Sequence, residues 1–149
     1  MTEINFYHLT FSPLERALPK LLERTLEGGK RALVLAASEA RVDALNSQLW
    51  TYEERGWLPH GSAKDGHAEQ QPIWLTDSIE NPNGASFLFL TDGSEHPEVA
   101  AFERVFELFD GRDDAAVQAA RDRWKRYREA GHTLAYWRQD DDGRWEKAN

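Results

Sequence analysis

The sequence has no cysteine, which excludes disulfide bonds, cysteine-based zinc sites, iron–sulfur ligation and a thiol nucleophile. It also has no apolar run that approaches the roughly 20 residues needed to span a bilayer. Its first residues lack the basic and apolar segments of a secretory signal. We therefore expect a cytoplasmic protein in a reducing compartment, without a membrane partner.

Motifs that bind nucleotides or activate a serine are missing as well. The chain has no Gly-x-Gly-x-x-Gly dinucleotide fingerprint and no Gly-x-Ser-x-Gly nucleophile elbow. The stretch 28–31, Gly-Gly-Lys-Arg, runs from a predicted helix into a predicted strand, whereas a phosphate loop runs from a strand into a helix. We therefore predict no catalytic residue and no cofactor.

Two sets of side chains have the chemistry of metal ligands. His60 and His67 lie in the long polar stretch Thr51–Gln71, but their spacing fits no known ligand pattern. Asp77 and Asp92 each follow a predicted strand, where α/β enzymes place Mg²⁺ ligands and where aspartate also forms turns and helix caps. We interpret both sets as structural and predict no metal site. A metal-dependent α/β enzyme using the two aspartates stays as an alternative.

An overall excess of positive charge is also missing, because the formal net charge is -8. This argues against general binding of duplex DNA, which needs a broad basic surface. Five of the 18 Lys and Arg residues nevertheless fall within the run Arg121–Arg128, whose net charge of +4 leaves -12 for the remaining residues. Clustered beside Trp124 and Tyr127, these cations predict a local surface for a small acidic partner.

Residue patterns predict alternating strands and helices in a single domain, residues 1–149. A length of 149 residues, with 40% hydrophobic and 30% charged residues, is typical of one globular domain. The predicted strands are Ile4–Leu9, Arg31–Ala36, Ile73–Thr76, Phe87–Thr91 and Thr133–Trp137. The predicted helices carry the leucines at 14–22, follow Ser38, span Pro97–Phe109 and span Asp113–Ala130. This alternation indicates a three-layer α/β/α sandwich around a mostly parallel sheet.

The last predicted helix has a cationic face. At 100° per residue, Arg121, Lys125 and Arg128 lie together, with Trp124 and Val117 at the edge. A peptide with acidic residues and a free carboxylate after an apolar side chain would fit, because guanidinium groups bind carboxylates and the edge residues accept the apolar group. Cations near the end of a helix also complement its dipole, so a purely structural interpretation stays open.

The opposite face of this helix is expected to pack on the sheet. It carries Ala116, Ala119, Ala120 and Tyr127. Arg123 lies within the same arc, so we expect its stem to be buried and its guanidinium group to reach solvent.

Apolar residues beside the long polar stretch form a second candidate surface. Trp50, Trp57 and Leu58 stand close to Pro59 and His60, and such groups anchor partner proteins when they are exposed. Trp50 continues the apolar stripe of its helix, so we expect it in the core, whereas Trp57 fits either interpretation.

Several segments together resemble the chi subunit of the bacterial DNA polymerase III holoenzyme. In chain order, they are Asn5-Phe6-Tyr7-His8-Leu9, Gly29-Lys30-Arg31, Leu49-Trp50, Trp57-Leu58-Pro59-His60, Gln71-Pro72-Ile73, Phe102-Glu103-Arg104-Val105-Phe106 and Ala120–Gly131. The set is collinear and covers nearly the whole chain. The resemblance implies a Rossmann-like fold without a nucleotide site, in a non-catalytic subunit associated with the clamp loader and the replisome.

The resemblance also implies two partner surfaces. The family links the polymerase to single-stranded DNA-binding protein (SSB) by binding its acidic C-terminal tail, which ends in Pro-Phe. By position, the tail-binding residues are Arg121, Trp124, Lys125, Arg128 and Val117. The psi subunit, which connects to the clamp loader, or a competing helicase binds the second surface. Its residues by position are Trp57, Leu58, Pro59, His60 and Trp50.

Direct binding of single-stranded nucleic acid is the alternative function. Bases stack on indole rings while cations hold the phosphates, and the helix with Trp124 offers both groups. In the chi-like interpretation, by contrast, single-stranded DNA is contacted mainly through SSB.

Overall fold

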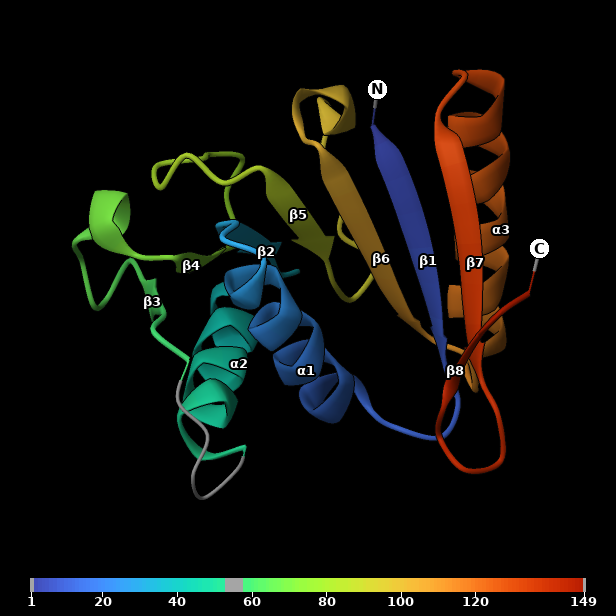
Figure 1. Cartoon of the computed structure of the whole chain (residues 1–149), viewed down its shortest axis with the longest axis horizontal. Helices are drawn as coiled ribbons and strands as arrows, with labels where there is room; N and C mark the ends of the chain where they lie inside the picture. Colours follow the sequence, from blue (N-terminus) through green and yellow to red (C-terminus); the bar gives the residue numbers. More distant parts are fainter. Residues whose placement is uncertain (1, 53–57, 149) are drawn as a thin grey trace.

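The computed structural model describes residues 2–52 and 58–148, which form an α/β fold around an eight-stranded sheet (Figure 1). The strands are β1 (Glu3–Leu9), β2 (Ala32–Leu35), β3 (Gly61–Ser62), β4 (Ile73–Thr76), β5 (Phe87–Leu90), β6 (Arg104–Asp110), β7 (Thr133–Gln139) and β8 (Trp145–Lys147). The helices are α1 (Leu14–Glu27), α2 (Glu39–Thr51) and α3 (Asp114–Glu129), with 3₁₀ turns η1 (Ala68–Gln70) and η2 (Val99–Ala101). The predicted α/β class is confirmed.

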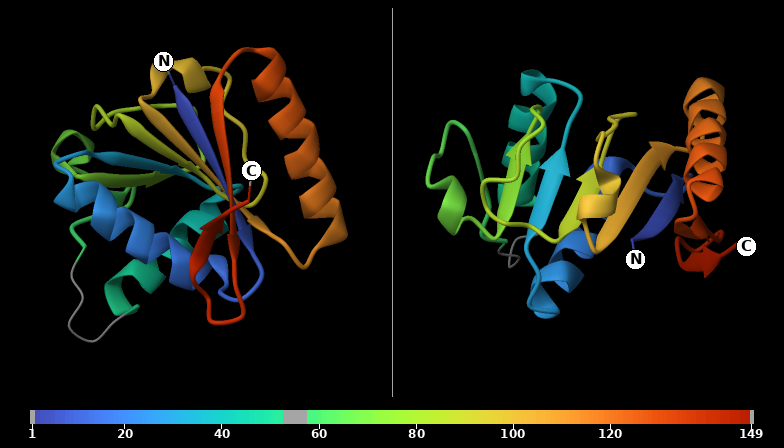
Figure 2. Two further views of the ribbon diagram at one scale, coloured as in Figure 1. Left: turned by 45° about the vertical axis from the view of Figure 1, so that its right-hand side comes forward. Right: turned by 90° about the horizontal axis from the view of Figure 1, so that it is seen from above.

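The strand order is β3-β4-β2-β5-β6-β1-β7-β8, and all neighbouring strands are parallel except β7 and β8. Helices α1 and α2 contribute to one hydrophobic core and α3 to a second. Figure 2 shows the strands lying between α3 and the other two helices, as the predicted three-layer arrangement requires. No helix in the described part of the chain is long and apolar enough to cross a membrane.

The stretch predicted as a helix at Pro97–Phe109 is instead the turn η2 followed by the central strand β6. Val105 and Phe109 are buried in the core on the α3 side, while Phe106 and Leu108 are buried in the core on the α1 side. A strand covered on both faces carries a continuous apolar run. The spacing of that run also fits a helical stripe, which is why the prediction was wrong.

Two short strands extend the sheet beyond the prediction. In the stretch predicted to be an irregular loop, β3 pairs in parallel with β4. At the other edge, β8 pairs antiparallel with β7 and brings Trp145 against Tyr7, with ring centroids 4.9 Å apart. Trp145 thereby joins the core on the α1 side.

Helix α3 begins and packs largely as predicted. The Asp113 carboxylate accepts hydrogen bonds from the backbone N–H groups of Ala115 and Ala116, which caps the helix. Ala120 is buried against the sheet, but Ala119 is exposed. The small-residue face is therefore narrower than the sequence predicts.

The guanidinium group of Arg123 does not reach solvent, which corrects the prediction. Its Nε donates to Oε2 of Glu107 on β6 at 2.9 Å, and the Tyr127 hydroxyl donates to the same oxygen at 3.2 Å. The Arg123 and Glu107 side chains are only 5% and 1% exposed. Burial raises the pKa of the Glu107 carboxyl, an effect that Arg123 and Tyr127 oppose. The buried ion pair therefore joins α3 to the centre of the sheet.

Arg123→Met should lower the free energy of unfolding by about 3–5 kcal/mol, because the Glu107 carboxylate would stay buried without its charged partner. Adding Glu107→Leu should recover most of this loss, since no buried charge remains. Urea denaturation measures both changes. As a control, Arg126→Met breaks an exposed pair with Glu95 and should cost less than about 1 kcal/mol. An equally small loss for Arg123→Met would contradict the importance of the buried pair.

Candidate functional site

The outward face of α3 carries three cations that no carboxylate in the described residues neutralises. Arg121, Lys125 and Arg128 are exposed, and none of them forms an ion pair there. The other two cations of the basic run, Arg123 and Arg126, are both paired with carboxylates. The three unpaired cations are the ones that the helical pattern places on one face.

Trp124 and Val117 lie where this cationic face meets the sheet. Both side chains are half-buried and pack against the core on the α3 side. The Trp124 ring centroid lies 5.3 Å from that of Phe6 on β1 and 5.7 Å from that of Tyr136 on β7. Trp124 therefore points toward β1 and β7, at the edge of the cationic face.

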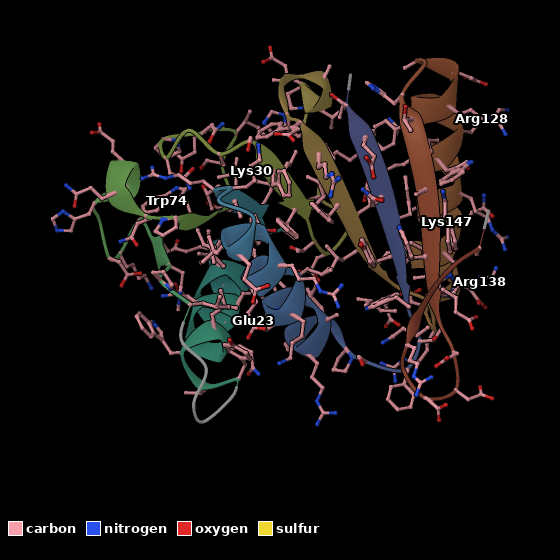
Figure 3. The ribbon with its side chains drawn as sticks, in the orientation of Figure 1. Glu23, Lys30, Trp74, Arg128, Arg138 and Lys147 are labelled. Carbon is pink, nitrogen blue, oxygen red and sulfur yellow. The ribbon has the colours of Figure 1, made fainter. Side chains whose placement is uncertain are left out.

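Strands β1 and β7 add residues to this site that the sequence pattern did not predict. A hydrogen bond of 2.6 Å joins His8 Nδ1 to the Tyr136 hydroxyl, and the Arg138 guanidinium carbon lies 5.7 Å from the centre of the Tyr136 ring. Figure 3 shows Arg138 and Arg128 on the side of the molecule formed by β7 and α3. The sequence feature that could have identified Tyr136 and Arg138 is the period-two alternation of a strand that follows a crossover helix. Alternate side chains of such a strand face the helix.

Burial and the surrounding charges favour the neutral form of the His8 imidazole. Burial lowers the pKa of His8, and the nearby charges of Arg138 and Arg121 lower it further. Burial also raises the pKa of Tyr136, an effect that the same two arginines oppose. Arg121 on α3 and Arg138 on β7 therefore both act on the pKa values of this pair of side chains.

The second predicted surface is partly buried. Leu58 and His60 are buried, and the His60 ring hydrogen-bonds to the backbone carbonyl groups of Leu58 and Asn46. Trp50 is 52% exposed and lies over the His60 ring, so its predicted core position is wrong. It follows Leu49 on the helix and is turned 100° away from that buried stripe. Trp57 lies outside the described residues.

The carboxyl ends of β1 and β6 border a cavity of about 600 Å³. These adjacent strands lead to helices on opposite faces, a position where open α/β sheets commonly bind ligands. Three charged groups of this cavity are bonded to each other, because Arg41 donates to Asp92 at 2.8 Å and to Glu15 at 3.2 Å. Asp77 is exposed. Among the described residues, no group of three His, Cys, Asp or Glu is placed to hold a metal ion.

Known proteins match most of this chain. It matches the family described as DNA polymerase III chi subunit, HolC, over residues 1–135. It is 31% identical to the probable DNA polymerase III subunit chi of Rickettsia prowazekii over 109 residues, which cover 73% of this chain and 66% of that protein, just under two thirds. It is 30% identical to DNA polymerase III subunit chi of Pseudomonas aeruginosa over 138 residues, or 90% and 94% of the two chains. The protein of the same name from Escherichia coli is 25% identical over 130 residues, or 85% and 88%.

The family match includes all of α3 and its cationic face. It ends one residue before Tyr136, so the end of β7 and the strand β8 lie beyond it. The similarity to the Pseudomonas protein extends over nearly the full length of both chains. The chain therefore belongs to the DNA polymerase III chi subunit family, a family of accessory replication subunits.

Proposed function

We propose that this chain is a non-catalytic, clamp-loader-associated subunit of DNA polymerase III that binds the acidic C-terminal tail of SSB on the outward face of α3. The observation that carries the proposal is a set of cations beside Trp124 that pair with no carboxylate of residues 2–52 and 58–148, in a chain of net charge -8. Membership of the chi family supports the replication context.

The cationic face suits a short acidic segment better than a long polyanion. Arg121, Lys125 and Arg128 recur at intervals of four and three residues, so they form one row along the helix. An extended peptide lying along this row can place its carboxylates against successive cations. The residues outside the run Arg121–Arg128 sum to -12, and their field repels longer nucleic acids.

Trp124 and Val117 supply the apolar part of the tail site. A tail that ends in Pro-Phe carries a ring next to its terminal carboxylate, and aromatic rings bury large apolar areas with specific geometry. Direct stacking of a nucleic-acid base is less favoured, because the rings of Phe6 and Tyr136 already contact the half-buried indole.

We propose the surface around Trp50 and Pro59 as the docking site for the psi subunit or a competing helicase, and psi as the link to the clamp loader. An indole with 52% exposure offers the apolar anchor that such contacts use. The buried Leu58 and His60 hold this surface in place through the hydrogen bonds of the His60 ring.

Calorimetric titration with a short acidic peptide ending in Pro-Phe tests the tail site. Arg121→Ala and Lys125→Glu should each weaken binding about tenfold or more, because a hydrogen bond to a charged group contributes roughly 1.5–3 kcal/mol. Arg126→Ala is the matched control, since its guanidinium group already pairs with Glu95. This control should bind nearly as well as the parent chain.

Full-strength binding by both variants would refute the tail site. A labelled single-stranded oligonucleotide serves as the second ligand in the same titration. Strong binding of the oligonucleotide without SSB, falling steeply with added salt, would favour the direct nucleic-acid alternative. We expect no measurable binding of the oligonucleotide.

Trp50→Ala should weaken binding of the psi subunit from the same bacterium by at least tenfold, because buried tryptophans at interfaces commonly contribute more than about 2 kcal/mol. Biolayer interferometry with immobilised psi measures the change. Phe11→Ala and Ile79→Ala are controls, since these side chains are similarly exposed, 57% and 55%. Equal losses for the controls would show that the effect does not belong to this surface.

A further inference from the structure

The second half of β7 provides α3 with a neighbour of matching chemistry. Side chains alternate along the strand, so Tyr136 and Arg138 lie on the α3 face while Trp137 packs into the core on the α1 side. Both α3-facing residues stand beyond residue 135, where the family match ends. The positions that match the family therefore do not account for them.

Arg138 lies beside the first half of α3. The helix runs antiparallel to β7, and a strand rises about 3.3 Å per residue whereas a helix rises about 1.5 Å. The five steps from Thr133 to Arg138 thus span about as much length as eleven helix residues. Counted back from the end of α3 at Glu129, this places Arg138 level with Val117 and Arg121. The influence of Arg121 and Arg138 on the pKa of His8 agrees with this placement.

We propose that Tyr136 and Arg138 form the second side of the tail-binding surface, and that Arg138 binds the partner's terminal carboxylate together with Arg121. This inference rests on the proposed binding of an acidic tail by α3. The rings of Trp124 and Tyr136, with centroids 5.7 Å apart, form an apolar platform between the two arginines. Two guanidinium groups that approach from different elements can each bind one oxygen of a carboxylate.

No carboxylate of the described residues forms an ion pair with Arg138. Its guanidinium group lies against the Tyr136 ring, which leaves donors for a ligand. Glu146 stands opposite Arg138 in the β7–β8 pairing, on the same face, but the two side chains do not reach ion-pair distance. A ligand carboxylate therefore does not have to displace a partner from Arg138.

The strand pair also offers a matched control. Lys147 stands opposite Trp137, so it lies on the other face of the sheet and points away from α3. Lys147→Ala removes the same unit of charge from the same strand pair as Arg138→Ala. Any general loss of electrostatic attraction affects both variants alike.

Two peptides distinguish the contribution of the terminal carboxylate to binding from that of the rest of the tail. Both are acidic and end in Pro-Phe, one with a free carboxylate and one with a C-terminal amide, and calorimetry measures their binding to the full chain. With the free acid, Arg138→Ala should lose about tenfold in affinity, and Lys147→Ala should stay within about twofold of the parent chain. With the amide, the parent should already bind about tenfold or more weakly, and Arg138→Ala should cause little further loss.

Each outcome decides a different point. Equal small effects of Arg138→Ala and Lys147→Ala on the free-acid peptide would overturn the inference while leaving the tail site on α3 intact. Equal losses of Arg138→Ala with both peptides would show that Arg138 does not bind the terminal carboxylate, which also overturns it. Failure of the parent chain to bind either peptide would overturn the proposed function and this inference with it.

Discussion

The buried ion pair between Arg123 and Glu107 fixes how α3 sits on the sheet. Glu107 lies on the central strand β6, so its carboxylate is available only to a residue on the inner face of the helix. Positions two residues away on a helix lie 200° around its axis. With Arg123 held inward, Arg121 and Lys125 are turned outward, and Arg128 follows on the same side as Arg121. One buried contact thus accounts for the orientation of the cationic face.

The outward face of α3 matters because of how charge is distributed over the chain. Lys64 and Arg41 are held by carboxylates of the chain, whereas Arg121, Lys125 and Arg128 on the outward face of α3 pair with no carboxylate of the described residues. An acidic chain whose described residues leave this cationic row unpaired attracts small acidic segments and repels long nucleic acids. The proposed specificity for a chain terminus depends on geometry, in which we assign separate roles to the indole of Trp124 and to Arg138 on β7.

The α/β class, the extent of α3 and its outward cations could be predicted because they follow from local periodicity and capping. The helix predicted at Pro97–Phe109 was wrong because burial on both faces removes the alternation that distinguishes a strand. The inward guanidinium group of Arg123 depends on a carboxylate 16 residues away in the sequence, which no local pattern reveals. Trp50 lies one position past a buried residue. Arg138 can be placed beside α3 only when the crossover connection from α3 to β7 is known. The positions of Arg123 and Arg138 thus depend on tertiary contacts, whereas the errors at Pro97–Phe109 and Trp50 come from ambiguous local spacing.

The central claim is that an acidic chain terminus binds where α3 and β7 meet, and NMR of the ¹⁵N-labelled chain during titration with an acidic Pro-Phe peptide tests it most directly. We expect the largest shifts at the indole N–H of Trp124, along the outward face of α3 and at the end of β7. Saturable shifts confined to the cavity at the carboxyl ends of β1 and β6, or to the region of Trp50, with α3 unchanged, would contradict the account.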